Sequence, residues 1–333
     1  MADFNRSIYD QMRANRWRTA YMFMIFPIII IGLTYIAFLL TGLFDSNYSI
    51  SAIDLANEMM STIGFWVLLA VVVWSFISYF LGSRMIMAFA GAKPIEKKDD
   101  PRLYRIVENV SIAAGLPKTP DIYIINDSSL NAFATGTNPK NSKVAISKGL
   151  LDKLEKDELE GVMAHEIGHI LNRDIRVMLL SITLVGAIEM IGEILIRSRG
   201  GGSRNKSSGP LILIGILFLT VGVLVGTLTR LAISREREYL ADATGSHLIS
   251  NPLALVGALE KIAGDARIEI LDTKTSMAGL CIADPSAIGH KKHTQFKMGL
   301  SDKKQDSGLM GQWKKLWSTH PPMEERIARL KGY

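Results

Sequence analysis

Cysteine is almost absent from this sequence, since Cys281 is the only one in 333 residues. A single cysteine excludes an intramolecular disulfide, and without a CxxC pair the chain cannot build a thiolate metal site. The low cysteine content also fits a reducing compartment. Histidine is scarce as well, with six residues. Any metal site must therefore be built from a few histidines and from carboxylates.

A recognisable nucleic-acid-binding module is also missing, although the formal net charge is +6. The sequence contains no basic run interleaved with aromatic residues. Much of the positive charge instead flanks apolar segments, where it would set a membrane orientation. Charged residues make up only 21% of the chain and hydrophobic residues 48%. We therefore expect no nucleic-acid partner and consider a membrane protein first.

Two long segments, residues 19–44 and 61–83, contain no charged residue at all. Each exceeds the roughly 20 helical residues that cross the hydrocarbon of a bilayer. A cleaved signal peptide is a poorer interpretation of the first segment, because its apolar run is too long and no small-residue cleavage site follows it. Both segments are predicted to be transmembrane helices.

Basic residues indicate how these two helices are oriented. Residues 1–18 contain four arginines, and Arg84 and three lysines follow the second helix. The loop between the helices contains acidic residues and no Lys or Arg. Because Lys and Arg gather on the cytoplasmic side, both flanks and the bulk of the chain are predicted to be cytoplasmic.

Residues 101–172 have the composition of a soluble, mixed α/β region. Residues 102–114 have helical periodicity. Three short strands are predicted, at residues 121–126, 131–135 and 143–146. Asp157, with Glu160 three residues later, is predicted to be the N-cap of the helix that follows.

A second pair of apolar segments, residues 175–196 and 210–231, is predicted to form a hairpin of transmembrane helices 3 and 4. Glu189 and Glu193 interrupt the first of them on one helical face. The loop between the segments is basic, which the positive-inside rule would keep cytoplasmic. A hairpin partly shielded by protein is therefore the alternative.

The remainder of the chain shows weaker periodicity in its sequence. Residues 265–315 are polar and basic, and no structure is predicted for them. A last helix is expected at residues 323–331.

Within the mixed region, His165-Glu166-Ile167-Gly168-His169 has the H-E-x-x-H spacing of a zinc site on a helix. Residues four apart project from nearly the same face, so both imidazoles can bind one zinc ion. Glu166 lies about 100° further round the helix. There it can act as general base on a water that zinc activates, and it can return the proton to the leaving amine. A surface helix with a chance pattern is the alternative, but a capped helix after short strands is the right context for the motif.

A catalytic zinc site needs a third protein ligand. Glu238 is the strongest candidate, because Glu238 and Asp242 are four apart on a predicted helix and both can face the histidine pair. Asp242 would then accept a hydrogen bond from a ligand imidazole and fix its tautomer. A solvated helix, in which both acids pair with neighbouring arginines, explains the same spacing equally well. Asp174 is less suitable, because it lies at the wrong height on a helix continuing from His169. Other candidates on chemistry alone are His247, His290, His293 and His320.

Three motifs in this order resemble the HtpX family of bacterial membrane zinc metalloproteases, relatives of the CAAX prenyl proteases and of OMA-type mitochondrial proteases. They are HEIGH at residues 165–169, SREREYLAD at 234–242 and THPP at 319–322. The stretch NAFATG at 131–136 also resembles the family's strand beside the zinc helix. The resemblance extends from the first apolar segment to the C-terminus.

This resemblance implies an α-helical integral membrane protein, mostly helical with a small β-sheet, that carries a gluzincin-like α+β metalloprotease domain. Residues 84–174 and 232–333 would be the two parts of that domain, on the cytoplasmic side of a bacterial inner membrane. One Zn²⁺ ion per subunit is implied. Glu238 is implied as its third ligand, beside His165 and His169.

The resemblance also implies roles for two residues near the C-terminus. His320 would stabilise the oxyanion of the tetrahedral intermediate. Alternatively it is structural, and the two prolines after it shape the turn into the last helix. Arg326 would pair with Asp242 or with another acidic group near the site.

In folds of this kind the substrate adds a strand to an exposed sheet edge. The predicted edge consists of Asn131, Ala132, Phe133, Ala134 and Thr135. The small side chains of Ala132 and Ala134 would let a substrate backbone approach. A packed strand without a substrate role is the alternative.

With the resemblance, the sequence predicts a membrane-embedded zinc endopeptidase that cleaves misfolded or damaged membrane proteins at the cytoplasmic face. Its expected partners are polypeptides, especially membrane proteins, and the lipid bilayer. The alternatives are a maturation protease for one precursor peptide and a catalytically silent, zinc-stabilised membrane protein that binds or regulates others. Glu166 argues against the last, because a structural zinc site needs no base beside an open coordination position.

Overall fold

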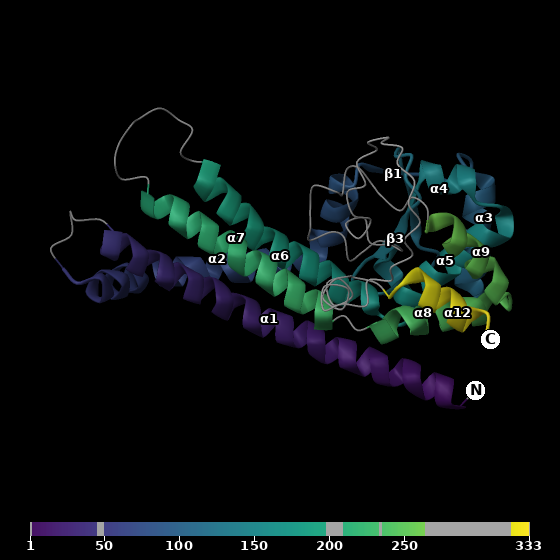
Figure 1. Ribbon diagram of the computed structural model, residues 1–333, viewed down its shortest axis with the longest axis horizontal. Coiled ribbons are helices and arrows are strands. Elements are labelled where there is room, and N and C mark those ends of the chain that lie inside the picture. The colour runs from purple at the N-terminus through teal and green to yellow at the C-terminus, as the bar shows by residue number, and fades with distance from the viewer. Residues whose placement is uncertain (1, 45–49, 198–208, 233–234, 264–320, 333) are drawn as a thin grey trace, which may run out of the picture. The chain divides into compact units, whose positions relative to one another are not determined.

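The computed structural model describes residues 2–44, 50–197, 209–232, 235–263 and 321–332. Over these residues the protein is mostly helical, with one small sheet (Figure 1). The chain divides into two compact units. We call Met1–Gly82 with Leu179–Thr229 the apolar unit, and Ser83–Met178 with Arg230–Tyr333 the mixed unit.

Long apolar helices make up the apolar unit. Their bounds are α1 (Ala2–Phe44), α2 (Ala52–Phe89), α6 (Asp174–Arg197) and α7 (Gly209–Ala232). The stretches long and apolar enough to cross a membrane are Arg13–Phe44, Ala52–Phe89 and Asp174–Arg197. In α7, the apolar stretch with described side chains is the shorter Leu211–Gly226. The helices include all four segments that the sequence predicts to be transmembrane.

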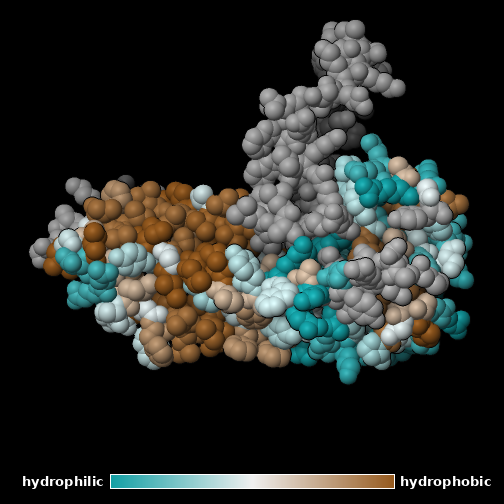
Figure 2. Space-filling view, turned by 90° about the horizontal axis from the view of Figure 1, so that it is seen from below, coloured by the Kyte–Doolittle hydropathy of each residue, from teal (hydrophilic) through white to brown (hydrophobic). Residues whose placement is uncertain are grey.

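The surface of the apolar unit has large hydrophobic side chains facing outwards (Figure 2). On α2, for example, Phe65, Trp66, Phe76 and Phe80 are each more than half exposed. A soluble protein rarely leaves such a continuous apolar surface uncovered. Lipid is the environment that suits this apolar surface. Helices are stable there because they satisfy their own backbone hydrogen bonds.

The described strands of the mixed unit form a four-stranded sheet in the order β1-β2-β4-β3. Their bounds are β1 (Ala92–Pro94), β2 (Asp121–Ile125), β3 (Ala132–Thr135) and β4 (Lys143–Ser147). Strands β2 and β4 are parallel, and the other two pairs are antiparallel. The three predicted strands are present within about a residue of their expected bounds. The sequence did not predict β1, because three residues ending in proline show no periodicity.

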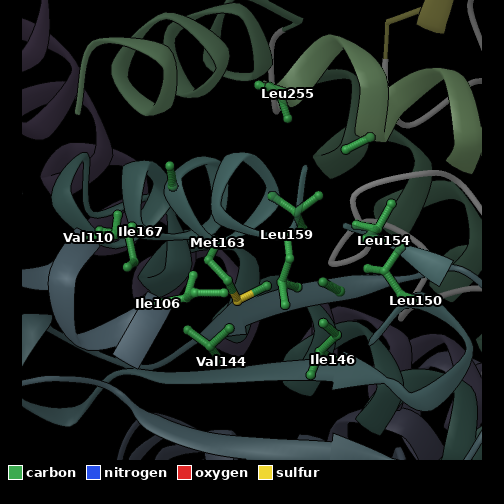
Figure 3. Close-up of a cluster of buried hydrophobic side chains, with 14 of the residues drawn as sticks. Ile106, Val110, Val144, Ile146, Leu150, Leu154, Leu159, Met163, Ile167 and Leu255 are labelled. Carbon is green, nitrogen blue, oxygen red and sulfur yellow. The ribbon is translucent and has the colours of Figure 1, made fainter. Parts of the chain in front are cut away.

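Helices pack around the sheet. They are α3 (Pro101–Ala113), α4 (Lys148–Lys153), α5 (Lys156–Leu171), α8 (Arg235–Ile249), α9 (Pro252–Ile262) and α12 (Met323–Leu330). Helix α5 lies against β3, α3, α8 and α9. In Figure 3, Val144 and Ile146 of β4 meet Leu159 and Met163 of α5 in one buried apolar cluster. Leu255 of α9 belongs to the same cluster. The apolar face of α5 is therefore fixed in the core, and this anchors its polar residues. Residues 265–315 lie outside the described residues.

Candidate metal centre

Helix α5 carries both histidines of the predicted motif. It begins after Glu155, whose backbone N–H donates to the Glu158 carboxylate at 2.8 Å. The prediction that Asp157 is the N-cap was wrong, because Asp157 already lies in the first helical turn. The three functional residues of the motif are all buried.

Helix α8 approaches α5 closely and brings Glu238 to the histidines. A Cβ atom on Gly245 would lie 2.8 Å from the backbone nitrogen of His165. A Cβ atom on Gly168 would lie 3.2 Å from the backbone oxygen of Ala241. At Gly245 there is room for hydrogen only, so glycine allows the two helices to pack backbone to backbone.

The predicted ligands His165, His169 and Glu238 meet in one cluster, in which one ligand atom of each lies within 4.8 Å of the others. The Nε2 atom of His165 is 3.7 Å from Oε2 of Glu238, and Nε2 of His169 is 3.6 Å from Oε1. Two imidazole nitrogens and one carboxylate oxygen suit a zinc ion and leave a coordination position open. The donor set therefore fits the metal that the sequence predicts.

The charges around the histidines also favour a divalent cation. Among the described residues, four carboxylates and two guanidinium groups are buried at this site: Glu166, Asp174, Glu238, Asp242, Arg237 and Arg326. With all four carboxylates ionised and both histidines neutral, the state in which they can bind a metal, these groups sum to two negative charges. Because uncompensated buried charge is costly, a cation with two positive charges stabilises the cluster.

Glu166 is buried beside this cluster and faces strand β3. Burial raises the pKa of its carboxyl to about 7, although the charge of His169 opposes the shift. The carboxylate accepts a hydrogen bond from the backbone N–H of Ala134. A carboxyl with a pKa near neutrality can both accept and return a proton.

His165 is held on its far side by Asp242. Its Nδ1 lies 2.9 Å from Oδ1 of Asp242. Arg326 of α12 binds the same carboxylate with two hydrogen bonds, from Nε at 2.9 Å and from Nη2 at 2.6 Å. Burial alone would raise the pKa of Asp242, but Arg326 outweighs it and lowers the pKa to about 2. Burial lowers the pKa of His165 to about 4 despite its hydrogen bond to Asp242.

His169 is held in the same way by Asp174, a contact that the sequence analysis missed. Its Nδ1 lies 3.0 Å from Oδ2 of Asp174. Burial alone would lower the pKa of His169, but the hydrogen bond to Asp174 and the charge of Glu238 outweigh it and raise the pKa to about 9. On one continuous helix Asp174 would lie at the wrong height, whereas in the structure α5 ends at Leu171 and α6 begins at Asp174. An acidic residue at the start of a new apolar segment was the available signal.

Strand β3 is the last strand of the described sheet, and β4 is its one described neighbour. The Ser147 backbone N–H donates to the Asn131 carbonyl, so alternate residues from Asn131 onwards direct their backbone groups towards β4. The backbone groups of Ala132 and Ala134 face the other way. The Asn131 side chain accepts from the Ala132 N–H at 2.8 Å. The methyl groups of both alanines belong to the buried core.

The other histidines considered as ligands do not join the described cluster. His247 is exposed on α8. The candidates His290, His293 and His320 lie outside the described residues.

Comparison with known proteins decides the family. Residues 97–333 match peptidase family M48. The chain belongs to this family. This chain is 37% identical over 336 residues to a "Protease HtpX homolog" of Bacteroides fragilis, and the match covers 98% of this chain and 98% of the relative. It is 41% identical over 268 residues to a protein of that name from Tropheryma whipplei, covering 80% of this chain and 84% of the relative.

A solved structure is similar at greater distance. The crystal structure of S. mikatae Ste24p matches with a TM-score of 0.46 and 20% identity, covering 82% of this chain and 60% of Ste24p. The M48 membership confirms the predicted protease family. With its apolar helices, the protein is a membrane metalloprotease that acts on polypeptides.

Proposed function

We propose that this M48 protein is a zinc endopeptidase that cleaves misfolded or damaged membrane proteins at the cytoplasmic face of a bacterial inner membrane. The proposal rests on the position of Glu166. This residue follows a metal-cluster histidine in α5, and its carboxylate accepts a hydrogen bond from the Ala134 N–H on strand β3. A general base therefore lies between the metal cluster and a strand to which a peptide can add.

Each residue of the cluster has a defined task in this proposal. His165, His169 and Glu238 hold the zinc ion, and Asp242 with Arg326 orients His165. A bound zinc ion supplies Lewis-acid chemistry, because it lowers the pKa of water and polarises the scissile carbonyl group. Glu166 accepts the proton of the attacking water and passes it to the leaving amine. His320 as oxyanion donor stays a prediction from the sequence.

Strand β3 binds the substrate in this proposal. The backbone groups of Ala132 and Ala134 face away from β4. Their N–H groups already donate to the Asn131 side chain and to Glu166, so their carbonyl groups are the ones that can pair with an extended peptide. The alanine side chains contribute to the core rather than to this edge. Main-chain pairing is available to any extended peptide, which supports action on unfolded segments rather than on one sequence.

The test compares the zinc-loaded full-length protein with Glu166→Gln on unfolded casein. Removing the general base should slow cleavage by about 10²–10⁴-fold, while zinc content is unchanged. Glu160→Gln, on the same helix and away from the cluster, is the matched control and should cleave at the wild-type rate. Equal cleavage by Glu166→Gln and wild type would contradict the mechanism. Cleavage in cells of a single precursor, and of no damaged membrane protein, would favour the maturation protease.

A further inference from the structure

The contact between His169 and Asp174 requires a break in the helix. On a continuous α-helix, residues five apart point about 140° away from each other, so their side chains cannot meet. Here Nδ1 of His169 lies 3.0 Å from Oδ2 of Asp174, and the Asp174 side chain is fully buried. The chain must therefore turn between α5 and α6.

Arg173 makes that turn in a strained conformation. Asn172 closes α5, with its N–H donating to the carbonyl of Gly168. Arg173 then adopts a positive φ of 60°. Residues other than glycine are seldom found in this left-handed region, because their Cβ atom is strained there. One left-handed residue redirects the chain, so that Asp174 opens α6 beside the end of α5.

Asp174 is also fixed from its other side. Its second oxygen, Oδ1, lies 3.7 Å from Nη1 of Arg237, and neither side chain is exposed. A buried carboxylate with one oxygen towards an imidazole and the other towards a guanidinium group has little freedom to rotate. The arrangement resembles the one at His165, which Asp242 holds and Arg326 supports, but the Arg237–Asp174 pair is longer than the hydrogen bonds of Arg326. Each histidine is thus backed by an aspartate, and each aspartate by a buried arginine.

We propose that Asp174 is a positioning residue for the metal site. By accepting the Nδ1–H hydrogen bond it fixes His169 in the tautomer whose Nε2 faces Glu238 and the metal. Arg237 keeps the Asp174 carboxylate in place. This inference rests on the proposed function, since it takes His169 as a zinc ligand.

The test measures zinc affinity of the purified full-length protein by competition with a chromogenic chelator. Asp174→Ala should raise the zinc Kd by about 10–100-fold, the usual effect of losing such a partner. The visible spectrum of the Co²⁺-substituted protein should also change, because the orientation of the His169 ring is no longer fixed. If Asp174→Ala does not fold, Asp174→Asn, which preserves the side-chain volume, takes its place.

Arg173→Gly is the matched variant in the same turn. Glycine adopts the left-handed conformation without strain, so zinc affinity should stay within about twofold of wild type on that argument. An equal loss of affinity in Arg173→Gly would assign the effect to the turn and overturn the role of the carboxylate. Unchanged affinity and an unchanged Co²⁺ spectrum in Asp174→Ala would overturn it as well. A wild-type protein that binds no zinc would instead refute the proposed function.

Discussion

The two histidines of the metal cluster have similar neighbours and opposite pKa shifts. Each presents Nε2 to Glu238 and Nδ1 to an aspartate. Burial lowers the pKa of His165 to about 4, and the positive charge of Arg326 adds to the decrease. Asp174 and Glu238 outweigh burial at His169 and raise its pKa to about 9. In the metal-free protein at pH 7, His165 is therefore neutral and His169 is protonated.

Zinc binding should therefore depend on pH through His169. The metal must displace one proton, so affinity should rise about tenfold per pH unit and level off near pH 9. In the metal-free protein, the stability of the fold changes with pH in the opposite direction to the zinc affinity. A pKa raised above 6.5 stabilises the fold fully below pH 6.5, and this contribution is lost as the pH rises through about 9. Zinc affinity should be measured by chelator competition between about pH 6.5 and 8.5, the window in which the proton on His169 competes with the metal. An affinity independent of pH in that window would contradict a protonated His169.

At the scale of elements, the separation of α5 and α8 sets the geometry of the site. Two residues of the metal cluster come from α5 and one from α8, so any change in the distance between the helices moves Glu238 relative to both histidines. A Cβ atom on Gly245 would lie 2.8 Å from the backbone nitrogen of His165, so the backbones of α8 and α5 touch there. Because this contact is between backbone atoms, no flexible side chain can move aside to make room for a larger residue.

Gly245→Ala should therefore weaken both the fold and the metal site. Overpacking of this kind typically costs about 1–3 kcal/mol in the free energy of unfolding, which a lower Tm of the full-length protein would report. Zinc affinity should fall as well, because α8 must move away from α5. The control is Gly257→Ala on α9, whose new Cβ would lie 3.1 Å from Oε1 of Glu158, a side-chain atom rather than a backbone atom. Wild-type zinc affinity in Gly245→Ala would show that the helix separation does not set the site.

At the scale of the whole molecule, the chain combines an apolar unit suited to lipid with a mixed unit that carries the chemistry. Helices α2, α6 and α7 each belong to both units in sequence. The basic residues lie on both flanks of the first two apolar segments, and the loop between them is acidic. This pattern predicts a cytoplasmic mixed unit.

Single-cysteine labelling in intact bacterial cells tests that orientation. The background is Cys281→Ser, which removes the only native thiol. Glu58→Cys, in the region between the first two apolar segments, should react with a membrane-impermeant maleimide. Lys98→Cys should react only after the inner membrane is permeabilised. Both positions are exposed. Reaction of Lys98→Cys in intact cells would place the mixed unit outside the cytoplasm.

Local pattern was sufficient to predict the apolar helices, three of the four described strands and the placement of His165, Glu166 and His169 on one helix. These features depend on periodicity, on uncharged length and on four-residue spacing, all of which are properties of neighbouring residues. Spacing alone could not distinguish Glu238 as a ligand from Glu238 on a solvated helix; the family resemblance was needed.

Tertiary packing decided the rest. Glu238 reaches the histidines because Gly245 lets α8 touch α5, and Asp174 reaches His169 because Arg173 turns the chain through a left-handed conformation. The same packing turned the alanines of β3 into the core and left their backbone groups facing away from β4. Contacts between segments distant in sequence depend on how closely backbones can approach and where a helix breaks. Neither leaves a periodic signal in the sequence.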